Sequence, residues 1–176
     1  MKTFPNIETD RLILRQTIEK DWKEILFLRT SKEVNKYIKS SLKPPSNEVD
    51  TKAFVDKIYT KGFENDDNIN WSVVIKNMDK MIGSVCYWNF SEDRKKAEIG
   101  YAMIPDFYNL GYMREALKAI LGYGKNKLNL EVVEAFTHCK NEASKRLLVK
   151  CKFALKEGEV DEGNEDNLIY QKRFKI

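Results

Sequence analysis

Residues 104–113 form a short segment that could bind an anion. Its sequence, IPDFYNLGYM, joins the end of an expected strand to the start of an expected helix. The first N–H groups of a helix have no partners within the helix, so they can hold a phosphate group. Gly111 lets the backbone approach a ligand closely, and Asn109 tolerates a left-handed conformation almost as glycine does. A glycine before a helix is also common in turns that bind nothing, so the spacing alone leaves phosphate binding and a plain turn both open.

Four further polar residues could take part in chemistry. Asn141 suits the N-cap of a helix, where capping is a sufficient explanation. Ser144 lies one turn into that helix, and its hydroxyl can either stay near the helix end or point into a cleft as a donor. Glu98 lies in an expected strand that leads into the turn, so its carboxylate is either a proton acceptor or an ordinary exposed glutamate. His138 is the only histidine, and a structural role is favoured because no partner is identifiable.

The spacing of apolar residues predicts the elements that position these side chains. Short aliphatic and aromatic runs predict strands within residues 7–17 and at 71–75, 81–90, 97–104, 132–139, 153–157 and 167–174. Helical spacing predicts helices after an Asp21 cap, at 49–62, at 111–128 and from Asn141, with a weaker helical stretch at 34–38. The strands between 71 and 104 form an antiparallel meander. The order predicts an α+β fold around a mixed sheet.

The composition is that of an ordinary globular protein. The 176 residues carry 31 basic and 27 acidic side chains, a formal charge of +4, and 42% of them are hydrophobic. A chain of this size can bury one core without a disulfide or metal, so we expect a single domain over residues 1–176. The apolar runs are far shorter than the roughly 20 residues of a membrane-spanning helix, and residues 1–6 form no apolar leader. We therefore expect a cytoplasmic protein that does not bind a membrane.

Charges and cysteines disfavour other classes of function. Basic residues are intermixed with acidic ones and do not alternate with aromatic residues, which disfavours a nucleic-acid partner. Cys86, Cys139 and Cys151 lack the spacing of a zinc site, so we expect reduced thiols and no bound metal. Six of the ten residues at 157–166 are acidic, which predicts a solvated loop between the last two strands.

The order of these segments resembles a known family. The strand at 97–104, the turn at 108–113 with REAL at 114–117, the spacing of Asn141 to Ser144, and KCKF at 150–153 resemble the GNAT superfamily of N-acetyltransferases. The opening ETDRLILR at residues 8–15 is typical of the branch related to the ribosomal-protein N-terminal acetyltransferases. The resemblance covers nearly the whole chain. It implies the GNAT acyl-CoA N-acyltransferase fold, with a mixed central sheet of about seven strands and flanking helices.

The resemblance also implies which residues bind acetyl-CoA. The family holds the pyrophosphate on backbone amides of the turn after its fourth strand, which maps here onto Tyr108, Asn109, Leu110, Gly111, Tyr112 and Met113, followed by Arg114. The pantetheine arm would pair with backbone groups of Met103 and Ile104 and lie near Asn141. Asn109 and Met113 replace the small residues of the family pattern, and Lys152 stands where the family has glycine.

The implied activity is transfer of acetyl from acetyl-CoA, as co-substrate, to a primary amine by direct attack, without a metal or covalent enzyme intermediate. Glu98 would accept the proton of the amine, and Ser144 would act as the acid toward the leaving thiolate. A protein N-terminal amine is the favoured acceptor, with a small-molecule amine as the alternative. The acidic segment 157–166 would favour a cationic amine if it borders the acceptor cleft. A catalytically weakened CoA-binding or regulatory module is the alternative function, and either a monomer or a homodimer fits.

Overall fold

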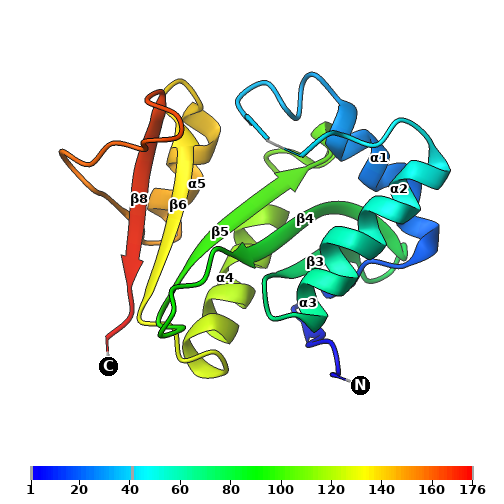
Figure 1. Cartoon of the computed structure of the whole chain (residues 1–176), viewed down its shortest axis with the longest axis horizontal. Coiled ribbons are helices and arrows are strands. Elements are labelled where there is room, and N and C mark those ends of the chain that lie inside the picture. Colours follow the sequence, from blue (N-terminus) through cyan, green and yellow to red (C-terminus); the bar gives the residue numbers. More distant parts are fainter. Residues whose placement is uncertain (1, 41, 176) are drawn as a thin grey trace.

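The computed structural model describes residues 2–40 and 42–175 as one sheet with helices on both faces (Figure 1). The eight strands lie in the order β1-β2-β3-β4-β5-β6-β8-β7. Their bounds are β1 Ile7–Glu8, β2 Leu12–Gln16, β3 Ile69–Ile75, β4 Lys80–Trp88, β5 Lys96–Met103, β6 Val132–His138, β7 Ala154–Leu155 and β8 Asn167–Arg173. Strands β5 and β6 are parallel, and the other neighbouring pairs are antiparallel. The predicted mixed sheet and its meander are confirmed.

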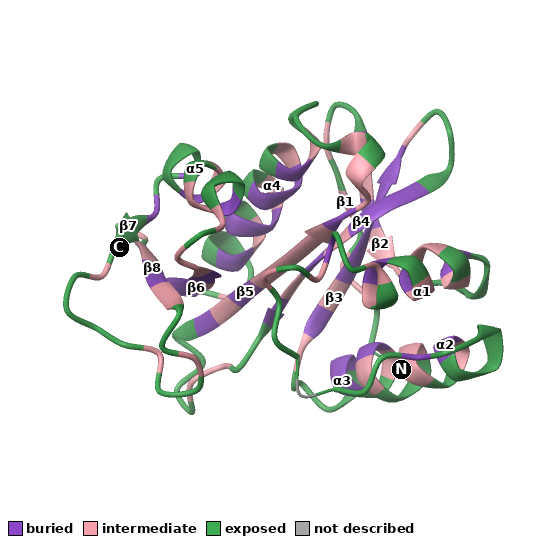
Figure 2. Ribbon diagram, turned by 90° about the horizontal axis from the view of Figure 1, so that it is seen from above, coloured by how far each residue is buried: buried purple, intermediate pink, exposed green. Residues whose placement is uncertain are grey.

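The helices form two layers, one on each face of the sheet (Figure 2). Helices α1 (Trp22–Thr30), α2 (Glu48–Phe54) and α3 (Lys61–Glu64) lie on one face, with a π-helical stretch at Val55–Thr60 between α2 and α3. Helices α4 (Tyr112–Asn126) and α5 (Glu142–Lys150) lie on the other face. In the part of the chain that the structure describes, no helix is both long and apolar enough to cross a membrane.

Two apolar clusters hold these layers together. The larger one joins the sheet to α4, and its fully buried members include Trp71, Leu117 and Ile120. The smaller one joins the other face to α1 through Ile25 and Met81. The helical stripe predicted for α4 is buried as expected, because its residues recur every three or four positions.

The weaker helix predicted at 34–38 is wrong, because this stretch forms turns. The side-chain amide of Asn35 donates to the carbonyl oxygens of Leu28 and Ser31, at 2.9 Å each. These bonds occupy carbonyl groups at the end of α1, and such local side-chain bonds compete with helix formation. Residues 32–37 therefore follow α1 as turns and not as a helix.

Asp21 stands before α1 as predicted, but its carboxylate does not cap that helix. It accepts hydrogen bonds from the Arg15 guanidinium at 2.6 and 2.9 Å and from the Ile18 N–H at 2.9 Å. The Asp21 side chain is 3% exposed, so this charge pair is shielded from water. The pair fixes the connection from β2 into α1.

Candidate active site

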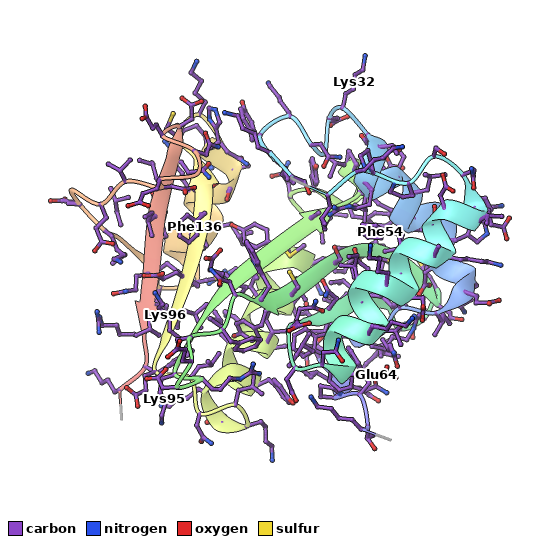
Figure 3. All side chains as sticks on the ribbon, in the orientation of Figure 1. Lys32, Phe54, Glu64, Lys95, Lys96 and Phe136 are labelled. Atoms are coloured by element: carbon purple, nitrogen blue, oxygen red, sulfur yellow. The ribbon has the colours of Figure 1, made fainter. Side chains whose placement is uncertain are left out.

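The sheet opens between its two parallel strands, β5 and β6. Their pairing covers residues 96–98 against 132–134, and both strands continue past these pairs. Figure 1 shows the two strands diverging from there. Lys96 lies at the closed end of this split, and Phe136 lies on β6 farther along it (Figure 3). The split leaves backbone N–H and C=O groups along the strand edges, and an extended ligand can pair with such edges.

Met103 and Ile104 differ in what they offer to the split. The Ile104 N–H donates to the carbonyl oxygen of Ile82 at 2.8 Å, so it is already paired on the β4 side. Backbone groups of successive strand residues point to opposite edges, so those of Met103 point into the split. Of these two expected pantetheine contacts, Met103 is the one whose backbone is directed toward the opening.

The turn before α4 combines two left-handed residues with an open helix end. Asn109 has φ +61° and Gly111 has φ +83°. No side chain caps α4, so the N–H groups of its first turn have no side-chain acceptor at the cap. Leu110 is 53% exposed and Tyr108 is 40% exposed, whereas the Met113 side chain packs into the core. The predicted turn is therefore present, and Met113 can contribute only its backbone to it.

Arg11 and Glu115 brace this turn from outside, which the sequence did not reveal. The carboxylate of Glu115, in the first turn of α4, accepts hydrogen bonds from the Thr9 hydroxyl at 2.6 Å and from the Arg11 N–H and Nε at 2.9 and 2.7 Å. The Arg11 Nη1 also donates to the Leu110 carbonyl at 3.0 Å, and the guanidinium lies 4.3 Å from the Tyr112 ring centre. Burial disfavours the charged carboxylate, but these hydrogen bonds outweigh it and lower the pKa of Glu115.

Ser144 lies at the centre of a hydroxyl cluster. Asn141 caps α5 as predicted, because its side-chain oxygen accepts the Ser144 N–H at 3.2 Å. The Ser144 hydroxyl oxygen lies 2.7 Å from the Tyr101 hydroxyl of β5 and accepts a hydrogen bond from the Thr137 hydroxyl of β6, also at 2.7 Å. Burial raises the pKa of Tyr101 and the bond to Ser144 opposes this shift, so the phenol stays protonated at neutral pH. Sequence reasoning missed Tyr101 and Thr137.

Glu98 is half-buried at the last position where β5 pairs with β6. Its carboxylate accepts a hydrogen bond from the Asn89 side-chain amide at 2.5 Å. Burial, followed by the charges of Glu134 and Asp161, raises the pKa of Glu98 against the opposing effect of Asn89. Glu134, directly across on β6, forms ion pairs with Lys156 and Lys96 at 2.9 and 3.4 Å. A carboxylate with a raised pKa is a better match for proton transfer near neutral pH.

Glu98 and Tyr101 lie on opposite faces of the split sheet. Side chains alternate along a strand, and these two positions are three residues apart on β5. Tyr101 shares the face of α5, where Ser144 lies, whereas Glu98 shares the other face with Trp88 and Asn89. A ligand in the split would therefore meet a carboxylate from one side and hydroxyl groups from the other.

His138 and the acidic segment lie near the open end of the split. The His138 Nδ1 accepts the Lys140 N–H at 3.1 Å, its ring stacks 5.1 Å from Tyr37, and its Nε2 lies 3.8 Å from an Asp166 oxygen. These contacts agree with the expected structural histidine. Residues 157–166 form the loop between β7 and β8 as predicted, and Lys39 donates to Asn164 in this loop at 3.0 Å.

Cys86, Cys139 and Cys151 are free thiols. Within residues 2–40 and 42–175, no group of three or more His, Cys, Asp or Glu side chains is arranged to hold a metal ion.

Comparison with known proteins relates this chain to one family. The model of the acetyltransferase (GNAT) domain matches residues 11–154. Over 159 residues the chain is 31% identical to the N-acetyltransferase YoaA of Bacillus subtilis, whose function is uncharacterised, covering 88% of this chain and 85% of that protein.

Solved structures share the whole architecture. The microcin self-immunity acetyltransferase MccE, in complex with acetyl-CoA and AMP, superimposes with a TM-score of 0.76 and 23% identity, covering 94% of each chain. RimL, a ribosomal alpha-N-protein acetyltransferase in complex with coenzyme A, superimposes with a TM-score of 0.80 and 17% identity, covering 96% of this chain and 98% of RimL. Both share the fold described above.

Proposed function

This chain belongs to the GNAT acetyltransferase family, and on that premise we propose that it acetylates a primary amine, with a protein N-terminal amine as the favoured acceptor. It is an N-acetyltransferase, and acetyl-CoA is the acetyl donor. The observation that carries the proposal is the split between β5 and β6, with Glu98 on one face and the Tyr101 and Ser144 hydroxyls on the other. Residues 1–176 act as one catalytic domain.

The residues at the split fit an acyl-CoA substrate. The backbone groups of Met103 face the opening and suit the amides of a pantetheine arm. The N-terminal N–H groups of α4, with Asn109 and Gly111 in left-handed conformations, suit a pyrophosphate group. Arg114 lies exposed in the same turn of α4 and adds a positive charge. Asn141 lies beside Ser144 at the start of α5.

The two faces then serve two parts of the reaction. An amine is protonated at neutral pH, so Glu98 accepts a proton from it, directly or through water. The nitrogen lone pair then forms the new C–N bond to the acetyl carbon, the C–S bond breaks, and its electron pair leaves on sulfur. The nitrogen loses its second proton to give the amide, and the sulfur takes up that proton to give the free CoA thiol. A hydroxyl at Ser144 stabilises that developing thiolate by a hydrogen bond. Holding the amine against the thioester supplies much of the remaining acceleration.

Two observations bear on the identity of the amine acceptor. The opening segment of residues 8–15 resembles the branch that acetylates ribosomal-protein N-termini, and RimL, which carries that activity in its name, shares the fold. The charge of Asp161, in the acidic segment 157–166, contributes to the raised pKa of Glu98. This arrangement favours an acceptor that carries positive charge.

Titration with acetyl-CoA, followed by thiol release, tests the proposal. We expect micromolar binding in a calorimeter and thiol release that depends on the amine, strongest among N-terminal peptides compared with polyamines and free amino acids. Release with polyamines or amino acids alone would move the acceptor to the small-molecule class. Binding without release for any amine would favour the alternative of a CoA-binding regulatory module, and absence of binding would contradict both.

A further inference from the structure

The middle of the sheet is only partly covered on the face where α1 and α2 lie (Figure 2). Cys86 of β4 pairs with Gly100 of β5, and Trp88 pairs with Glu98. All four positions are on this face, because Ala102, two positions after Gly100, packs against the smaller apolar cluster together with α1. Trp88 is exposed, and the other three positions are half-buried. A ligand can therefore reach the sheet surface beside Glu98.

Tyr59 is a buried side chain on this face whose hydroxyl has no partner among the described residues. It lies in the π-helical stretch at Val55–Thr60, is 8% exposed, and packs its ring edge-on against Phe54 with the ring centres 5.6 Å apart. Within residues 2–40 and 42–175, every fully enclosed side-chain nitrogen or oxygen has a hydrogen-bond partner. The unpaired Tyr59 hydroxyl must therefore reach the surface, where it can donate to a ligand. π-Helical turns are also frequent at functional sites.

Arg29 brings a positive charge to the same place. It lies in the last turn of α1, and its guanidinium carbon is 4.9 Å from the centre of the Phe54 ring, which Tyr59 also contacts. Among the residues that the structure describes, no carboxylate forms an ion pair with it, and its side-chain hydrogen bond, from Nη2 to the Ser40 hydroxyl, is 3.4 Å long. A guanidinium has five N–H donors, so most of them are available to a ligand.

The electrostatics of this region agree with two opposite charges. Burial raises the pKa of Tyr59 to about 12 against the opposing charge of Arg29, so the phenol stays protonated and is a donor at neutral pH. Burial also raises the pKa of Cys86 to about 11; the charge of Arg29 opposes this shift and the charge of Glu98 adds to it. The Cys86 thiol therefore interacts with a positive charge and with a negative one. A ligand over Cys86 would meet both.

We propose that Arg29 and Tyr59 bind a carboxylate of the acceptor, so that the preferred substrate is an amine that also carries an acid group. A guanidinium and a neutral phenol both donate, and a guanidinium matches the two oxygens of a carboxylate. The inference rests on the proposed acetyl transfer, which places the reacting amine at Glu98. The positive charge favoured by the acidic segment 157–166 is then the ammonium group before it loses its proton. Two sources carry the acid group: an acidic side chain near a protein N-terminus and the α-carboxylate of a free amino acid.

Binding of matched acceptors to the full-length protein tests the site without any acetyl transfer. The protein is saturated with CoA, which carries no acetyl group, and acceptors are titrated into it in a calorimeter. One pair consists of peptides that differ only by Asp or Asn at the second or third position, and the other of free alanine and alaninamide. We expect the acid member of one pair to bind about tenfold more tightly than its amide, because a charge-assisted hydrogen bond is lost in the amide. The pair that shows this preference identifies the source of the acid group.

Variants assign the preference to these two residues. Arg29→Gln should bring the acid-to-amide ratio of Kd values to about one, by weakening the acid member and leaving the amide within about twofold. Lys23→Gln is the matched control, because it removes the same charge from an exposed position of α1 and should keep the preference. Tyr59→Phe should reduce the preference about threefold, whereas Tyr123→Phe, which removes another hydroxyl without a hydrogen bond among the described residues, should not. Equal binding within both pairs, or a preference that survives in Arg29→Gln, would overturn the proposal.

The failure of the inference and that of the proposed function give different results. A wild-type protein that binds the acid member through Arg29, yet releases no thiol from acetyl-CoA with any amine, contradicts the acetyl transfer while the carboxylate site stands. A wild-type protein that acetylates the acid and amide members with the same kcat/KM contradicts the inference alone. A wild-type protein that binds neither member of either pair and releases no thiol overturns both.

Discussion

The Arg11 guanidinium and the Glu115 carboxylate join the start of the sheet to the first turn of α4, with Nε and Oε2 2.7 Å apart. The same guanidinium holds the Leu110 carbonyl and stacks on the Tyr112 ring. The left-handed turn at 109–111 is therefore fixed by a residue that lies about a hundred positions earlier in the chain. This brace positions the N–H groups that we assign to pyrophosphate binding.

Replacing Arg11 by lysine should weaken acetyl-CoA binding. Lysine keeps the positive charge but lacks the planar guanidinium that donates to both the Glu115 carboxylate and the Leu110 carbonyl. We expect the Kd for acetyl-CoA, measured by calorimetry, to rise about tenfold, the effect of about 1.4 kcal/mol, with little change in kcat. Arg173→Lys on β8, at the other side of the sheet, is the control. Equal Kd values for the two variants would contradict the bracing role.

Glu98→Gln should lower kcat by about 10- to 100-fold, because positioning retains part of the acceleration when a base is lost. The pKa of Glu98 is raised, and its charged form is the active one, so activity should fall as pH drops through a value above the ordinary 4.5. This limb of the profile of kcat against pH should vanish in the variant. Glu92→Gln, in an exposed turn, is the matched control. A limb that persists in Glu98→Gln would assign it to another group.

Substitutions at Asn109 test the departure from the family pattern. Asn109 already adopts the left-handed conformation of a glycine, with φ +61°. Asn109→Gly should therefore leave the Kd for acetyl-CoA within about twofold, whereas Asn109→Val should raise it, because a β-branched residue disfavours positive φ. Calorimetry on both variants measures the difference. A large gain in affinity for Asn109→Gly would show that the asparagine itself weakens the site.

Lys152→Gly should stabilise the protein by about 1 kcal/mol. Lys152 follows the end of α5 with φ +67°, where glycine has no steric penalty. The expected rise in Tm is about 2–4 °C for a chain of this size. Arg146→Gly, at an exposed position inside α5, should lower Tm because glycine disfavours a helix interior. An unchanged or lower Tm for Lys152→Gly would show that the lysine side chain compensates for its backbone.

Most of the elements could be predicted because their signals are local. The α4 stripe, the meander and the Asn141 cap each depend on residues a few positions apart, so spacing and capping chemistry identify them. The stretch at 34–38 differs from the expected helix because the Asn35 side chain bonds back to α1. The local spacing of apolar residues does not indicate whether such a side-chain bond or a helix will form.

The candidate site was only partly accessible to sequence reasoning. Glu98, Ser144 and Gly111 stand out by residue type next to an expected turn or cap. Tyr101 looks like an ordinary strand tyrosine, and its contact with Ser144 spans 43 positions along the chain. A pairing of this kind appears only when the sheet and α5 are assembled.

Only three residue pairs join β5 to β6, so the pairing between these two strands is short for an eight-stranded sheet. On either side of it, longer ladders join β2 through β5 and join β6 to β8. The sheet therefore has two larger groups of paired strands, which are hydrogen-bonded to each other only at one end of the edge between β5 and β6. A substrate that pairs with the free edges of both β5 and β6 adds hydrogen bonds between these two groups of strands. Because it binds only the folded protein, its binding raises the free energy of unfolding. The proposed substrate site thus coincides with a short junction in the interior of the sheet, and binding of the substrate should also stabilise the fold.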